Sequence, residues 1–269
     1  MSHPPAGSAI FSQPPGMVSY TYRHEFEEDV ASTLDRICAL GITDMEYSSL
    51  FGCSAEEIRI LLDERGMACS TYGVSYAKVQ EHTAEVAREA KALGADFVRV
   101  AWIDHESPFS PAAAQAVIKA FNRVGRCLRA EHDLTFAYHN HGFEFVPHGD
   151  GTLFDLIVQQ TDPEAVSFEL DILWAFFPGQ DPAALLRKYP TRFRLMHLKD
   201  LRRGVVGDLT GGTAQENDVA LGDGQLDLPA ILEAAHDSAV EHYYIEDESP
   251  STQSQVPRSI EYLASLTWR

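Results

Sequence analysis

The stretch VQEHTAEVAREAKALGADFVRVAW, residues 79–102, decides the fold of this chain. Its first part repeats apolar residues at helical spacing over a polar face, which predicts an amphipathic helix. The helix ends at Gly94, because glycine readily adopts the left-handed conformation of a helix C-terminus. A short apolar run, ADFVRVAW, follows and predicts a buried strand.

The same unit of helix, glycine and strand recurs along the chain. EEDVASTLDRICALG precedes ITDMEYS, and SAEEIRILLDERG precedes MACSTYGV, with Gly41 and Gly66 in the place of Gly94. With a first strand within residues 9–22, we count eight strands, each followed by a helix. Eight units in 269 residues predict an α/β fold with a parallel sheet, a single (β/α)8 TIM barrel that forms one domain over residues 1–269.

Composition excludes several classes of protein. The net charge of −19 disfavours nucleic acid and anionic membrane surfaces, because both attract clustered Lys and Arg. The four cysteines, Cys38, Cys53, Cys69 and Cys127, lie far apart without a CxxC pair, which favours reduced structural thiols. The start of the chain shows neither a signal peptide nor a transmembrane run. We therefore expect a cytoplasmic protein.

Polar residues gather at the ends of the predicted strands, which is where TIM barrels carry their active sites. The residues at these ends are Glu46, His139, His141, Glu144, Asp171, His197, Lys199, Glu246 and Glu248. Because side chains alternate along a strand, Glu169 and Asp171 share a face, as do His197 and Lys199. Several carboxylates that face one axis need a cation as partner, and mixed carboxylate and imidazole donors suit Mn²⁺, Mg²⁺, Co²⁺ or Zn²⁺.

Each of these residues also has a purely structural interpretation. His141 and His197 fit hydrogen-bonded core histidines, and Asp171 fits a helix N-cap. Glu46 and Glu248 fit solvated surface charges, while Lys199 and Asp200 fit a local ion pair. What favours a site is that four consecutive strands, five to eight, each place a ligand-type residue at the same end.

Two further segments fit a site at this end. Trp174, Phe176 and Phe177 lie close together in the sequence beside Asp171. We interpret them either as core or lid packing or as a wall on which a sugar stacks. The stretch 201–226 is the longest irregular segment and follows the seventh strand, so we interpret it as a lid or substrate loop.

The motifs YHNHGFEF, ELDILW, RFRLMHLKD, ALGDGQLDLPAIL and YYIEDES resemble, in their order, those of the sugar phosphate isomerase/epimerase family of xylose-isomerase-like barrels. The resemblance runs from about LDRICALGITDMEYS to the last helix. It implies one divalent metal ion, Mn²⁺ first, with Glu144, Asp171, His197 and Glu246 as ligands. It also implies that Glu144 and Glu246 serve as the acid/base pair, with His141 as the alternative ligand or a base beside it.

The resemblance implies an enzyme that removes a proton next to a sugar carbonyl, with epimerisation, isomerisation or β-elimination from a 3-keto-glycoside as outcomes. The expected partner is a small sugar or sugar glycoside, contacted by His139, Lys199, Glu46 and Trp174. A homo-oligomer or a small partner subunit is left open.

Two other functions remain as alternatives. One is an endonuclease-IV-like phosphodiester hydrolase. That branch has a histidine three positions after the strand-six aspartate, where this chain has Trp174, and the charge of −19 also counts against it. The other is a sugar-binding or partner subunit without catalysis, which would have lost its ligands.

Overall fold

The computed structural model describes residues 5–268. Eight parallel strands close into a barrel in the order in which they follow along the chain. They are β1 (Gly16–Val18), β2 (Asp44–Tyr47), β3 (Ala68–Val74), β4 (Phe97–Val100), β5 (Thr135–His139), β8 (Val166–Asp171), β9 (Phe193–Leu198) and β12 (His242–Ile245). The predicted (β/α)8 barrel is confirmed, and the first strand lies within the expected range.

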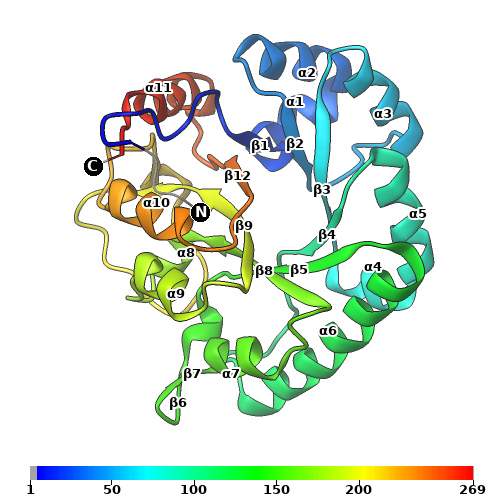
Figure 1. Cartoon of the computed structure of the whole chain (residues 1–269), viewed down its shortest axis with the longest axis vertical. Helices are drawn as coiled ribbons and strands as arrows, with labels where there is room; N and C mark the ends of the chain where they lie inside the picture. Colours follow the sequence, from blue (N-terminus) through cyan, green and yellow to red (C-terminus); the bar gives the residue numbers. More distant parts are fainter. Residues whose placement is uncertain (1–4, 269) are drawn as a thin grey trace.

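Helices form an outer ring around the strands (Figure 1). The longer ones are α2 (Val30–Ala39), α3 (Ala55–Asp63), α5 (Thr83–Leu93), α6 (Pro111–His132), α7 (Leu153–Gln160), α10 (Leu228–His236) and α11 (Thr252–Ser265). Shorter ones are α1 (Arg23–Glu28), α4 (Tyr76–Glu81), α8 (Ile172–Phe176), α9 (Pro182–Lys188) and the 3₁₀ turns η1 (Ser19–Tyr22) and η2 (Phe143–Phe145). No helix among residues 5–268 has the length and apolarity to cross a membrane.

The glycines that end the early helices have the expected conformation. Gly41, Gly66 and Gly94 have φ angles of 82°, 64° and 83°. A side chain is strained in this region, whereas glycine is not, so these residues allow the chain to turn from each helix into the next strand.

Strand alternation sorts the core into two parts. Outward side chains such as Tyr138 and Phe168 belong to the large apolar cluster between strands and helices. A small separate cluster of Phe97, Ala137, Leu195 and Tyr244 fills the barrel interior. Two residues farther along the same four strands are Arg99, His139, His197 and Glu246, all buried. The period of two therefore places a charged layer directly above an apolar one.

The segment after β9 is more ordered than a free loop. Strand β10 (Asp200–Leu201) pairs antiparallel with β11 (Asp218–Val219), which the turn η3 (Gln215–Asn217) precedes. The buried Asp200 carboxylate accepts backbone hydrogen bonds from Leu201 and, across the segment, from Gly222, Gly224 and Leu226. Asp200 thus closes the segment 201–226 at its base. A second short hairpin, β6 (Pro147–His148) with β7 (Gly151–Thr152), follows β5.

Candidate active site and metal centre

A cavity of about 380 Å³ lies at the carboxyl ends of the barrel strands. Its floor and one wall contain His139, His141, His197, Glu246 and Glu248, which come from β5, β9 and β12 and the turns after them. Volumes of this order are typical of small-molecule sites. The structure therefore has these polar residues at one end of the barrel, as the sequence predicted.

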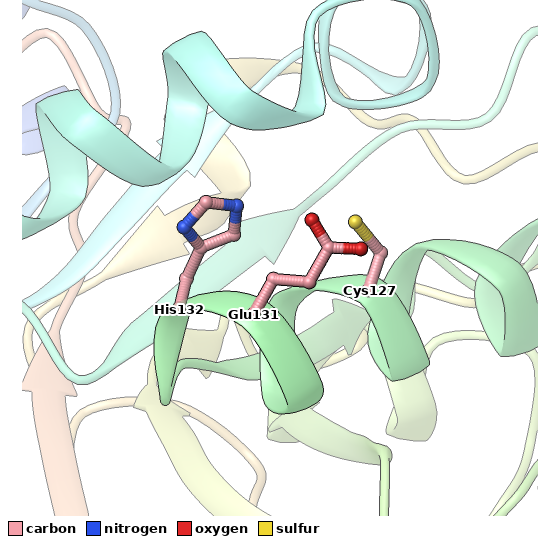
Figure 2. Close-up of side chains that lie close together, drawn as sticks. All are labelled: Cys127, Glu131 and His132. Carbon is pink, nitrogen blue, oxygen red and sulfur yellow. The ribbon is translucent and has the colours of Figure 1, made fainter.

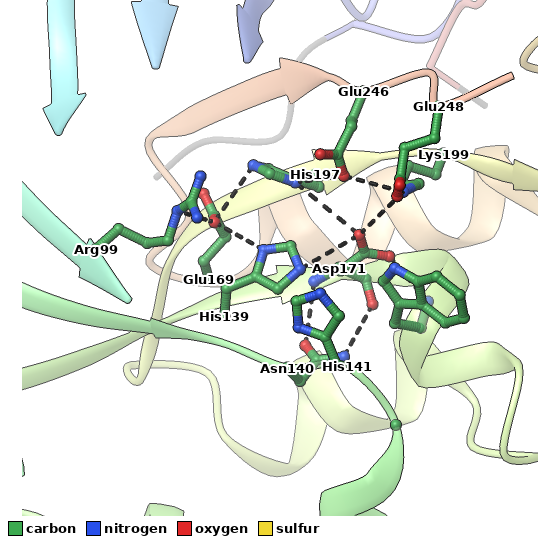
Figure 3. A network of polar contacts seen from close by, with 12 residues as sticks. Arg99, His139, Asn140, His141, Glu169, Asp171, His197, Lys199, Glu246 and Glu248 are labelled. Atoms are coloured by element: carbon green, nitrogen blue, oxygen red, sulfur yellow. Dashed lines mark hydrogen bonds and ion pairs between the residues drawn. The ribbon is translucent and has the colours of Figure 1, made fainter. Parts of the chain in front are cut away.

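Asp171, His197 and Glu246 form the first of two groups of potential metal ligands at this cavity. Each residue offers a ligand atom, and these atoms lie within 4.8 Å of one another. His197 Nδ1 is 3.0 Å from Glu246 Oε2 and 3.9 Å from Asp171 Oδ2. Figure 3 shows that the three side chains converge from β8, β9 and the end of β12.

Asp171 performs two tasks at once. Its Oδ1 accepts a hydrogen bond of 2.8 Å from the Trp174 amide and so caps helix α8. Its Oδ2 is buried and has no hydrogen-bond partner, although His139 Nε2 lies 3.5 Å away. A buried carboxylate oxygen without a partner is costly, and a cation in front of it removes the cost. The residues present therefore fit a divalent ion.

The second group shares His197 with the first and adds His139 and Glu169. Here Arg99 provides the positive charge: its guanidinium pairs with Glu46, and its Nε is 3.2 Å from Glu169 Oε2. His197 Nε2 lies 3.1 Å from Glu46 Oε1, opposite the ring nitrogen that faces Glu246. A carboxylate behind an imidazole fixes its orientation, so Glu46 orients the His197 ring.

The charges of the site follow from burial and pairing. Burial raises the pKa of Asp171 to about 7, with Glu246 adding to the rise and Lys199 opposing it. Burial alone would raise the pKa of Glu246, but Lys199 and His197 outweigh it and hold this pKa well below its usual range. Burial alone would likewise raise the pKa of Glu46, but Arg99 and His197 lower it to about 2.

The two histidines of β5 and its following turn stay neutral. Burial, together with the neighbouring His197, lowers the pKa of His139 well below its ordinary value. Burial lowers the pKa of His141 to about 3. His141 has a hydrogen bond with the backbone of Ala101, while its Nδ1 is buried without a partner. A neutral imidazole with a free lone pair is a proton acceptor.

Glu144 lies apart from the other expected ligands. Its carboxylate accepts hydrogen bonds from the Tyr138 hydroxyl and from the backbone amides of His141 and Gly142. Tyr138 points outward from the barrel and packs on Phe121, so the glutamate is directed away from the axis. The structure does not bring Glu144 together with Asp171, His197 and Glu246, because the amides after β5 and Tyr138 hold its carboxylate.

The other expected substrate contacts are distributed over three places. His139 lines the main cavity. Lys199 and Trp174 line a smaller cavity of about 30 Å³, and Glu248 belongs to both cavities. Glu46 lines neither, because it lies beneath the floor in its pairs with Arg99 and His197.

Lys199 is a buried cation beside Glu246. Its Nζ is 3.0 Å from Glu246 Oε2, 3.7 Å from Asp218 Oδ2 and also bonded to Glu248. The structural alternative of an isolated Lys199–Asp200 pair does not hold, since the Asp200 carboxylate binds backbone amides. Burial alone would lower the pKa of Lys199, but these carboxylates keep it well above its usual value.

Sequence reasoning missed several members of the site. Arg99 stands in the apolar strand FVRV, where a charge signals an inward position, and Glu169 shares a face with Asp171. Glu248 was interpreted as solvated, yet it binds Lys199. Asp218, buried in the segment after β9, carried no sequence signal, because only the β10–β11 pairing brings it to Lys199.

A third group of potential ligands, Cys127, Glu131 and His132, lies on helix α6 (Figure 2). This group sits in the last turns of α6, just before β5 begins, and therefore at the amino ends of the strands, opposite the cavity. Glu131 is exposed, and exposed acidic groups are common without an ion. We assign no role to this group.

Comparison with known proteins agrees with this architecture. The model of the family described as xylose isomerase-like TIM barrel matches residues 34–266. This chain belongs to that family, as its sequence motifs indicated.

Two curated relatives are inosose dehydratases. The one from Clostridium tetani is 35% identical over 88 residues, which cover 33% of this chain and 28% of the relative. The one from Geobacillus thermodenitrificans is 26% identical over 154 residues, 53% of this chain and 49% of the relative. The matched segments thus span half or less of these relatives.

Solved structures share the fold over nearly the whole chain. A sugar phosphate isomerase/epimerase from Parabacteroides distasonis has a TM-score of 0.76 at 22% identity and covers 97% of this chain and 98% of its own. The IOLI protein with a bound zinc atom has a TM-score of 0.72 at 13% identity and covers 93% and 95%. At these identities the likeness concerns the fold.

Proposed function

We propose that this protein is a divalent-metal-dependent enzyme that removes a proton from the carbon next to the carbonyl group of a sugar. One observation carries the proposal: the ligand atoms of Asp171, His197 and Glu246 lie within 4.8 Å of one another, and His197 and Glu246 line a cavity of about 380 Å³. The names of the relatives, inosose dehydratase and sugar phosphate isomerase/epimerase, support a sugar-type substrate.

Asp171, His197 and Glu246 would hold the ion, with His139 as the fourth donor. This set replaces Glu144 by His139, whose Nε2 faces the free oxygen of Asp171. Carboxylate and imidazole donors suit Mn²⁺ first, and Mg²⁺, Co²⁺ or Zn²⁺ by the same chemistry; the zinc in the IOLI protein supports such a site. The ion would stabilise negative charge on the carbonyl oxygen.

His141 accepts the proton in this proposal. Its ring is held between Trp102, with centroids 5.1 Å apart, and His139, at 4.7 Å, so its direction is fixed. Its Nδ1 is buried and has no hydrogen-bond partner in the protein, so this lone pair would accept the proton. General bases placed in this way contribute about 10²–10⁴-fold to a rate.

Lys199 and the carboxylates around it are placed to complete the reaction. Glu246 stays ionised and lines the cavity, and the Lys199 ammonium donates to it. This pair would orient a substrate hydroxyl and return a proton. Return to the opposite face gives epimerisation, return to the neighbouring carbon gives isomerisation, and loss of a β-substituent gives elimination.

The free state of all four cysteines fits the reducing cytoplasm that we propose as location.

The test is hydrogen exchange in heavy water. The protein, loaded with Mn²⁺, is incubated with a panel of ketoses, inososes and 3-keto-glycosides, and deuterium at the carbon next to the carbonyl is followed by NMR. We expect exchange with at least one substrate, and a fall of about 10²-fold or more in His141→Asn. Exchange that is equally fast in His141→Asn, or absent with every compound, would contradict the proposal.

A further inference from the structure

The cavity has two chemically different walls. Its ligand-type residues come from the second half of the barrel, from β5 to β12 (Figure 3). The wall from the first half carries Arg99 and Asp104, but most of its residues are aromatic or small: Tyr20 in η1, Tyr76 in α4, Trp102 after β4, and Ser48, Gly73, Val74, Ser75 and Ala101. A sugar ring alone, with hydroxyls all round, matches the charged residues of the cavity but leaves the aromatic side chains of this wall without a partner.

Two of the aromatic side chains are unusually exposed. Trp102 is 43% exposed and Tyr20 is 40% exposed. Among the residues that the structure describes, only Tyr20, Trp102, Ile60, Val206 and Leu209 are large hydrophobic side chains with such exposure. Two of these five therefore line the same cavity, and clustered apolar exposure of this kind marks a binding surface.

Trp102 is also rigid. Its ring makes edge contacts with His141 at 5.1 Å and 83° and with Phe143 at 5.1 Å and 68°. His105 packs on the same ring with centroids 5.5 Å apart. An indole supported in this way presents a fixed surface, so a ligand that stacks on it loses little side-chain entropy on the protein side.

We propose that Trp102 and Tyr20 form a subsite for a flat aromatic group that the substrate carries on its sugar. The substrate class is then an aryl glycoside or a similarly substituted sugar rather than a free monosaccharide. This inference rests on the proposed function for the sugar half of the cavity. It follows from the position of Trp102 against His141, because a group stacked there lies directly beside the carbon that His141 would deprotonate.

The test compares matched ligands by isothermal titration calorimetry. Phenyl and methyl β-glycosides of glucose, galactose and xylose are titrated into the Mn²⁺-loaded protein. Stacking on an indole predicts that, for at least one sugar, the phenyl glycoside binds about tenfold more tightly than its methyl counterpart. In Trp102→Ala the ratio should fall to about one.

Two variants control this result. Trp102→Leu keeps apolar contact with His141 and Phe143 but offers no flat face, so it should lose the phenyl preference while remaining folded. Trp268→Ala removes a half-buried tryptophan that packs on His236, away from the cavity, and should keep the preference. Thermal unfolding of each variant confirms that it is folded.

Several outcomes would overturn the subsite. One is that phenyl and methyl glycosides bind equally well. Another is that the preference for phenyl glycosides survives in both Trp102 variants. A third is that no phenyl glycoside binds. A loss of both ligands together in Trp102→Leu would place the sugar itself on the indole and contradict the proposal as well. Because binding needs no turnover, a phenyl preference without hydrogen exchange would refute the chemistry and keep the subsite, and the reverse result would refute the subsite alone.

Discussion

At the scale of single residues, the alternatives that the sequence left open are not exclusive. Asp171 is both the N-cap of α8, through Oδ1, and a ligand-type group, through the free Oδ2. His197 likewise uses one ring nitrogen toward Glu46 and the other toward Glu246. A structural role for one atom of a side chain therefore does not argue against a functional role for the other.

Glu144 is where the motif and the structure differ most. We predict that Glu144→Gln keeps the metal content of the wild type but lowers the free energy of unfolding by roughly 1–3 kcal/mol. The reason is that three hydrogen-bond donors, the Tyr138 hydroxyl and two backbone amides, face this carboxylate. In glutamine the NH₂ group replaces one carboxylate oxygen, and this group is itself a donor, so it cannot accept these hydrogen bonds. Urea unfolding and elemental analysis measure both quantities.

Tyr138→Phe provides the matched control, because it removes a single donor and should have a smaller effect on unfolding. If Glu144→Gln lost the ion while its stability stayed unchanged, Glu144 would return to the ligand set.

At the scale of elements, much of the barrel could be predicted. Helical periodicity followed by glycine located the units, and strand alternation identified which residues share a face, as Glu169 and Asp171 do. The position of Glu144 could not be predicted, because it depends on the turn after β5 and on the contact with Tyr138, which no periodicity encodes. Asp218 could not be predicted either, since it depends on the pairing of β10 with β11.

The segment 201–226 depends on Asp200. We predict that Asp200→Ala opens this segment, because four backbone amides lose their buried acceptor, and that its local free energy of opening falls by at least about 2 kcal/mol. Hydrogen exchange followed by mass spectrometry measures this for peptides from 201–226. Asp208→Ala is the control within the same segment, since Asp208 is exposed and bonds only to Thr210. Equal protection in wild type and Asp200→Ala would show that Asp200 does not hold the segment.

The amino ends of β2 and β12 are joined by a hydrogen bond between His242 and Asp44. Burial alone would lower the pKa of His242, but its hydrogen bond with Asp44, at 3.1 Å, and the charges of Asp44 and Glu241 raise it above its ordinary value. A raised folded-state pKa stabilises the protein fully below the unfolded value of about 6.5, and this stabilisation is lost as the pH rises through the folded value.

We therefore predict that His242→Gln lowers the free energy of unfolding more at about pH 5.5 than at about pH 9. Urea unfolding of both proteins at the two pH values measures the difference. A larger loss at the alkaline pH would have the wrong sign for a protonated His242.

At the scale of the whole molecule, the two ends of the barrel differ in their residues. The amino end contains the His242–Asp44 pair and the contact between the chain ends, where Ala9 pairs with Thr267. The carboxyl end contains the cavity and the buried charges. Within a chain of net charge −19, Arg99 and Lys199 are buried among these carboxylates, so the site combines carboxylate excess with two fixed cations. That residues 1–269 act as one domain stays a prediction.

The sequence predicted that most ligand-type residues lie at one end of the barrel, and the structure has them there, because side chains at strand ends follow the strand order. It could not assign each carboxylate to a layer. That depends on the depth of each residue in the barrel, which separates Glu46 beneath the floor from Glu246 at the cavity.

The measurement that tests the central claim most directly is the metal content of the dialysed protein after incubation with Mn²⁺, for wild type, Asp171→Asn and Asp181→Asn. Asparagine caps a helix about as well as aspartate, so Asp171→Asn keeps the α8 cap and removes only the charge in front of the ion. Asp181 caps α9 and is the matched control. We predict about one ion per chain in wild type and Asp181→Asn, and none in a folded Asp171→Asn. A wild type without an ion, or an ion that Asp171→Asn retains, would contradict the account.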